Sequence, residues 1–155
     1  MFSSFIEFVR EMYGTNDHIP LHAPKFVGDE SDYVLETIDS TYVSSVGKYV
    51  DQFEHDLSEY TGINHAVATV NGTAALHIAL KLSGVETNTE VITQSLSFVA
   101  TSNSIKYCGA YPIFIDVSTK TLGLSSNKLA DFLDEFGEMR DDGFCWNKIS
   151  KRKIS

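Results

Sequence analysis

The spacing of apolar residues predicts three amphipathic helices in the first 62 residues of the chain. Glycines are expected to end the first and third helices, and an aspartate or a serine is expected to cap the second. The predicted elements are a helix over 2–13 ended by Gly14, a helix begun by Asp29 or Ser31, a loop over 40–49, and a helix over 50–60 ended by Gly62.

From His65 onward the pattern changes to short apolar strands that alternate with helices. Such alternation predicts an α/β fold with a mostly parallel sheet, because parallel neighbours need a long crossover connection. The predicted elements are strands over 66–70, 91–93 and 111–116 and helices over 73–83, 97–107 and 126–136, with Gly84 closing the first of these helices.

After Phe136 the sequence becomes polar, and no further strand or helix is predicted. A parallel sheet of three strands would then have an unpaired edge, which natural domains rarely leave uncovered. The pattern therefore predicts that the chain is part of a larger domain. The basic residues near its end, such as Lys151 and Arg152, are expected to form a solvated tail.

The net charge of −9 opposes binding to nucleic acids or to an anionic membrane surface, since both would repel the chain. No apolar run reaches the roughly 20 residues that span a bilayer, and the first residues lack the basic region of a secretory signal. We therefore expect a soluble, cytoplasmic protein without nucleic-acid or membrane partners.

Neither the cysteines nor the histidines are spaced like metal ligands. Cys108 is predicted to be a small buried apolar residue, and no disulfide with Cys145 is expected. The five histidines are scattered along the chain and are predicted to be structural. No metal site is therefore predicted.

The candidate chemistry lies where the predicted strand 66–70 passes through Asn71, Gly72 and Thr73 into a helix. The first amides of a helix have no partner within it, and the aligned peptide dipoles add partial positive charge there. Gly72 lets the backbone approach an anion, and the Thr73 hydroxyl could cap the helix or donate to that anion. Two interpretations stay open, a phosphate-binding turn and an ordinary capped turn of an α/β domain.

Several short motifs follow one another along the chain: Ile19-Pro20-Leu21-His22, Phe26-Val27-Gly28-Asp29-Glu30, Ser44-Ser45-Val46-Gly47-Lys48-Tyr49-Val50, Val70-Asn71-Gly72-Thr73-Ala74-Ala75-Leu76-His77, Glu90-Val91-Ile92-Thr93, Ser97-Phe98-Val99-Ala100-Thr101 and Cys108-Gly109-Ala110. In the order and spacing of these motifs, nearly the whole chain resembles the N-terminal part of the DegT/StrS family of aminotransferases, which act on keto-sugars of sugar nucleotides. The resemblance is greatest to the branch of enzymes for legionaminic and related 4-amino sugars.

The resemblance implies a three-layer αβα architecture of fold type I, like that of aspartate aminotransferase, with pyridoxal 5′-phosphate (PLP) as cofactor. The implied segments are a helical arm with an active-site loop over 1–62, the start of the PLP-binding large domain over 63–137, and a polar tail over 138–155. Gly72, Thr73 and Ala74 are implied to hold the PLP phosphate. Phe98 is implied to stack on the pyridine ring, with a place in the core as the alternative.

The loop containing Ser45, Gly47 and Lys48 is implied to lie near the substrate, although a purely structural loop is an equal alternative. One departure from the family concerns the phosphate turn, where Asn71 stands in place of the serine of many relatives. It removes no group that a phosphate site requires.

The family's motifs for the lysine that bonds PLP and for the aspartate beside the pyridine nitrogen are absent from these 155 residues. We therefore expect a truncated aminotransferase that is inactive alone. The implied partners are a sugar nucleotide, glutamate and, in the full-length form, a second copy of the chain. A PLP-dependent sugar dehydratase, a phosphate-binding module without catalysis and a decaying remnant are the alternatives.

Overall fold

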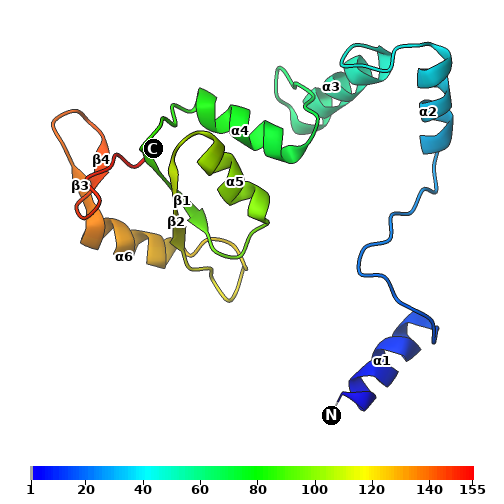
Figure 1. Cartoon of the computed structure of the whole chain (residues 1–155), viewed down its shortest axis with the longest axis horizontal. Helices are drawn as coiled ribbons and strands as arrows, with labels where there is room; N and C mark the ends of the chain where they lie inside the picture. Colours follow the sequence, from blue (N-terminus) through cyan, green and yellow to red (C-terminus); the bar gives the residue numbers. More distant parts are fainter. Residues whose placement is uncertain (1) are drawn as a thin grey trace. The chain divides into compact units, whose positions relative to one another are not determined.

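Residues 2–66 contain three helices. The computed structural model describes residues 2–155, and the chain divides into two compact units, unit 1 (1–66, described from residue 2) and unit 2 (67–155). Figure 1 shows the helices of unit 1, α1 (Ser3–Tyr13), α2 (Glu30–Asp39) and α3 (Lys48–Thr61).

The predicted helices of unit 1 and the glycines that end two of them are confirmed. Gly14 adopts a φ of 63°, and its amide donates to the carbonyl oxygens of Arg10 and Glu11. Gly62 ends α3 with a φ of 72°. The predicted cap of α2 is Asp29 and not Ser31, and its side chain makes no capping hydrogen bond. No residue of the range 2–66 is buried, so these helices are held mainly by their own backbone hydrogen bonds.

Unit 2 contains the α/β part of the chain. Its core is formed by Val85, Val91, Ile105, Cys108 and Ala110, so the predicted burial of Cys108 is confirmed. The elements are α4 (Gly72–Leu82), β1 (Glu90–Gln94), α5 (Val99–Tyr107), β2 (Tyr111–Ile115), α6 (Ser126–Phe136), β3 (Gly137–Met139) and β4 (Cys145–Asn147).

β1 and β2 are parallel neighbours, in register from Glu90 opposite Tyr111 to Gln94 opposite Ile115. α5 forms the crossover between them, as the sequence predicts, and packs against α4. Both helices run in the same direction in Figure 1, so their N-terminal ends lie toward the same side of unit 2.

The predicted strand over 66–70 is wrong. These residues make no strand pairing in the part of the chain that the structure describes, and Val67 and Val70 are 79% and 89% exposed. A strand exists only where a neighbouring strand shares its backbone hydrogen bonds, and among residues 2–155 the parallel sheet consists of β1 and β2 alone. The parallel sheet therefore has two strands rather than the predicted three.

The prediction that no strand follows Phe136 is also wrong. β3 and β4 form an antiparallel pair, and the chain then returns to β1, where the Glu90 amide donates to the Lys153 carbonyl at 2.8 Å. The side-chain amide of Asn147 donates to the buried Glu90 carboxylate at 2.9 Å. Apolar periodicity missed this arrangement because polar side chains hold it together.

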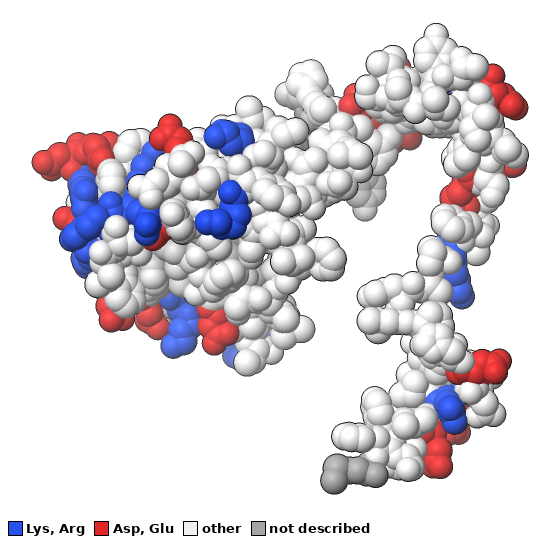
Figure 2. Space-filling model, viewed as in Figure 1, with Lys and Arg blue, Asp and Glu red and all other residues white. Residues whose placement is uncertain are grey.

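The negative net charge belongs to unit 1. Residues 1–66 carry twelve acidic and three basic side chains, whereas residues 67–155 carry nine of each. On the face drawn in Figure 2, most Lys and Arg side chains lie over unit 2. The predicted phosphate-binding turn therefore lies in a unit without net charge. Within residues 2–155, no helix has both the length and the apolar character needed to cross a membrane.

Candidate functional site

The N-terminus of α4 is capped by Asn71. Its side-chain oxygen accepts a hydrogen bond from the Ala74 amide at 2.9 Å, while its carbonyl accepts the first helical bond, from Ala75, at 3.1 Å. An extended backbone at Asn71 directs the side chain back over the first turn. The alternative in which Thr73 caps the helix is therefore wrong.

The amides of Gly72 and Thr73 remain open at this turn. Among residues 2–155 neither amide has a hydrogen-bond acceptor, whereas the Ala74 amide is occupied by Asn71. A Cβ added at Gly72 would meet nothing within 4 Å, so the space beside the Gly72 Cα is open. Two open amides at the positive end of a helix dipole suit an anionic group such as a phosphate.

Phe98 stands at the N-terminal end of α5 as its cap residue. Its side chain is 81% exposed, so the alternative that placed it in the core is wrong. The following turn is tied by a hydrogen bond between the hydroxyls of Ser97 and Thr101 at 2.8 Å. An exposed ring held by the start of a helix can offer its face to a flat aromatic ligand.

α4 and α5 are joined by a buried hydroxyl that the sequence analysis did not single out. The Ser104 hydroxyl lies 3.1 Å from the carbonyl oxygen of Thr73, in the first turn of α4. Phe98 and the open amides thus belong to two helices in direct contact within unit 2. The open turn and an exposed aromatic ring fit the two chemical features of PLP, its phosphate and its planar ring.

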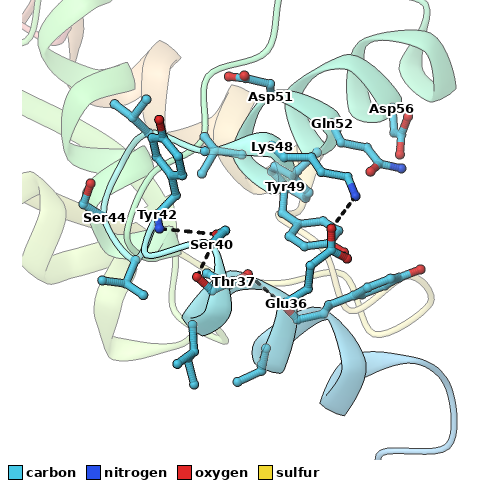
Figure 3. Close-up of a pocket in the computed structure, with 18 residues that line it drawn as sticks. Glu36, Thr37, Ser40, Tyr42, Ser44, Lys48, Tyr49, Asp51, Gln52 and Asp56 are labelled. Carbon is cyan, nitrogen blue, oxygen red and sulfur yellow. Dashed lines mark hydrogen bonds and ion pairs between the residues drawn. The ribbon is translucent and has the colours of Figure 1, made fainter.

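The substrate-loop candidates belong to unit 1 and lie beside α2 and α3. Gly47 and Lys48 line a groove of about 970 Å³ between these helices, shown in Figure 3, whereas Ser45 does not line it. A Cβ at Gly47 would come within 3.2 Å of the Tyr42 Cβ, which favours glycine at this position.

Lys48 is engaged by Glu36, a residue that the sequence analysis missed. The Lys48 ammonium lies 2.7 Å from the Glu36 carboxylate, and the Tyr49 hydroxyl donates to the second oxygen of that carboxylate (Figure 3). Both charged side chains are more than half exposed, so the pair contributes little to stability. Glu36 and Lys48 are twelve positions apart, and the sequence between them contains no motif that would pair them.

These contacts shift three pKa values. The hydrogen bond from Lys48 lowers the pKa of Glu36 below its usual 4.5, with a further contribution from Tyr49. The Glu36 carboxylate raises the pKa of Lys48 above 10.5 and that of Tyr49 above 10.0. Lys48 is therefore protonated at neutral pH, which makes it a poor nucleophile.

No group of three or more metal-ligating side chains occurs within the described residues 2–155. Of the predicted site residues, Gly72, Thr73, Ala74 and Phe98 lie in unit 2, whereas Gly47 and Lys48 line the groove in unit 1.

Residues 24–137 match the DegT/DnrJ/EryC1/StrS aminotransferase family. The chain belongs to this family. Its relatives include the GDP-perosamine synthase of Caulobacter vibrioides, which is 45% identical over 111 residues that cover 72% of this chain and 30% of that protein. The chain thus spans about 30% of the length of the curated relatives it matches.

Solved aminotransferases confirm the predicted α/β fold class. The aminotransferase from Psychrobacter cryohalolentis has a TM-score of 0.65 and 32% identity, covering 72% of this chain and 29% of that one. The PLP form of Spr1654 from Streptococcus pneumoniae has a TM-score of 0.64 and 26% identity, covering 74% of this chain and 29% of that one. Members of the DegT/DnrJ/EryC1/StrS family depend on PLP, as the resemblance in sequence implied.

Proposed function

We propose that this chain carries the PLP-phosphate-binding turn of an aminotransferase that transfers an amino group from glutamate to a keto-sugar nucleotide. The single observation that carries the proposal is the pair of open amides at Gly72 and Thr73, in a helix that contacts the one begun by Phe98. The GDP-perosamine synthase relatives support the substrate class. A role in polysaccharide biosynthesis is supported by another relative, the spore coat polysaccharide biosynthesis protein SpsC of Bacillus subtilis.

Each residue of the proposed site has a distinct role. The Gly72 and Thr73 amides would donate to the phosphate, and Asn71 would hold the first turn of α4 in the shape that leaves them open. Ala74 would keep the turn narrow with its small side chain. The exposed ring of Phe98 would orient the flat ring of PLP. Bound PLP supplies an electron sink for bond changes next to the amine nitrogen.

The groove of unit 1 would contact the sugar nucleotide. Hydroxyl and amide groups such as those of Tyr42, Ser44 and Gln52 line it and can hydrogen-bond to sugar hydroxyls. The pairing of Lys48 with Glu36 leaves no uncompensated positive charge on that side chain to attract a diphosphate. We therefore assign Gly47 and Lys48, but not Ser45, to the sugar end of the substrate.

Two further features bear on the cellular compartment and the oligomeric state of the proposed enzyme. Cys108 and Cys145 are both free, which is typical of a reducing compartment such as the cytoplasm. On α1, Phe5, Phe8 and Met12 are 63%, 58% and 62% exposed, and a second copy of the chain would cover such a surface in a homodimer.

The site is tested by titrating the full 155-residue chain with PLP and following the absorbance of the cofactor. Thr73→Asp places a carboxylate at the open amides, and we expect it to weaken binding at least tenfold through repulsion of the phosphate. Thr119→Asp adds the same charge to unit 2 at an exposed position outside α4 and α5, and is the matched control. Equal affinities of the two variants, or no binding by the unaltered chain, would refute the proposed site.

A further inference from the structure

Two contacts fix α5 against α4, one helical turn apart. The Ser104 hydroxyl lies 3.1 Å from the Thr73 carbonyl oxygen, and the Cys108 sulfur lies 3.9 Å from the His77 carbonyl oxygen. In both pairs the partners are 31 residues apart in sequence. The two helices are therefore parallel at these positions and advance in step, so one fixed axial offset relates them.

Ser104 is the more specific of the two contacts because it is fully buried, with 0% exposure. Its oxygen lies 3.1 Å from the Thr73 carbonyl oxygen and 2.8 Å from the Ala100 carbonyl oxygen of its own helix, so its single proton is shared between an acceptor on α4 and one on α5. A slide of α5 by one residue would carry the hydroxyl away from Thr73, while the Ala100 acceptor would move with it. The observed offset is therefore favoured by one buried hydrogen bond between the two helices.

This offset determines where Phe98 lies along α4. With a difference of 31 residues, Gly72 is level with Asn103, five residues beyond Phe98. At the helical rise per residue, Phe98 is displaced from Gly72 by about 8 Å along the common direction of the helices. Since Phe98 caps α5, any slide of that helix would shift the ring by the same amount.

We propose that Ser104 is a positioning residue that sets the spacing between the open amides of Gly72 and Thr73 and the ring of Phe98. This inference rests on the proposed function, in which those amides hold the PLP phosphate and Phe98 orients the PLP ring. The hydroxyl contacts the same residue, Thr73, whose amide is one of the two open donors. Ser104 acts through the geometry of the turn and does not touch the cofactor.

The experiment is a double-mutant cycle on the full chain, with PLP affinity as the readout. We expect Ser104→Ala to weaken PLP binding about fivefold, the effect of one hydrogen bond. We expect Phe98→Leu to weaken it by about the same factor through lost ring contact. Both changes remove the same contact, the one between the Phe98 ring and PLP. The affinity of the double variant for PLP should therefore fall about fivefold, whereas independent effects would multiply to roughly twenty-fivefold.

Ser102→Ala is the matched control, because Ser102 is a half-buried serine of α5 whose hydroxyl makes no hydrogen bond among residues 2–155. It should leave PLP affinity within about twofold, as expected for a side chain without a specific contact. Ser104→Cys keeps a weaker donor of similar shape, so it should bind PLP with intermediate affinity and provides the measurement if Ser104→Ala does not fold.

A second readout needs no cofactor. Hydrogen exchange of the Ala75 and Leu76 amides should become faster in Ser104→Ala than in Ser102→Ala, because the first turn of α4 has lost its tie to α5. Additive losses in the cycle, or unchanged exchange together with unchanged affinity, would overturn the role of Ser104 while leaving the PLP site intact. Absence of PLP binding by the unaltered chain would instead refute the proposed function on which the inference rests.

Discussion

Asn71 and Ala74 form the hydrogen bond that shapes the first turn of α4, the proposed phosphate-binding turn, with the Asn71 side-chain oxygen 2.9 Å from the Ala74 amide nitrogen. This bond satisfies one of the amides that a helix leaves free at its start, and it leaves those of Gly72 and Thr73 open. A single side chain thus fixes which amides can meet an anion.

The first prediction concerns this cap. Asn71→Ala should lower the free energy of unfolding by about 1 kcal/mol, because the Ala74 amide loses its acceptor. Asn71→Ser should recover most of the loss, since serine is also a good cap. Urea unfolding followed by circular dichroism measures both variants. Equal stability of the alanine and serine variants would show that the cap has no energetic role.

The second prediction concerns the lysines. Reduction of a mixture of the full chain and PLP with borohydride should modify no single lysine stoichiometrically. Lys48 is the lysine that we expect to lie near the substrate, and the Glu36 carboxylate raises its pKa, so its amine stays protonated. Peptide mapping by mass spectrometry measures the modification, and Lys48→Arg should give the same pattern at the remaining lysines. One fully labelled lysine would contradict the expectation that these 155 residues lack the cofactor-bonding lysine.

The third prediction concerns pH. Because the Glu36 carboxylate accepts a hydrogen bond from Tyr49, we expect the pKa of the Tyr49 phenol to lie above 10.0 and to return toward that value in Glu36→Ala. Ultraviolet difference titration, with Tyr49→Phe to assign the signal, measures the shift. Asp39→Ala removes another exposed carboxylate of α2 and should leave the titration unchanged.

The signs of the three shifts define the pH window of the Glu36 cluster. The pKa of Glu36 is lowered, so its contribution to folding is present above the unfolded value and is lost as pH falls through the folded pKa, below 4.5. The pKa values of Lys48 and Tyr49 are raised, so their contributions are present below the unfolded values and are lost at more alkaline pH. We therefore expect the contact between α2 and α3 to weaken at both extremes.

The fourth prediction concerns the return of the chain to β1. Asn147→Ala removes a donor from the buried Glu90 carboxylate and should destabilise unit 2 by about 2 kcal/mol, the cost of an unsatisfied buried group. Asn127→Ala, an exposed position in α6, is the matched control and should change stability by less than about 0.5 kcal/mol. Thermal unfolding of the two variants distinguishes these outcomes, and similar midpoints would mean that the Glu90 contact is dispensable.

Apolar periodicity and local signals predicted much of this fold. The helix over 126–136 has the predicted bounds, and Gly14 and Gly62 end their helices as expected, because such features depend on residues close in sequence. The burial of Cys108 could also be predicted, from its own apolar character. The predicted strand over 66–70 failed because a strand depends on a partner, which its own sequence does not specify.

For the candidate site, the sequence by itself determined the Gly72–Thr73 turn, where glycine and a following helix are local properties, and the family to which the motifs belong. Only the tertiary structure decided that Ser104 reaches Thr73 and that Glu36 and Glu90 find their partners in Lys48 and Asn147. Hydrogen bonds between distant polar residues follow from how the chain folds back on itself, and a polar side chain carries no periodic signal that names its partner.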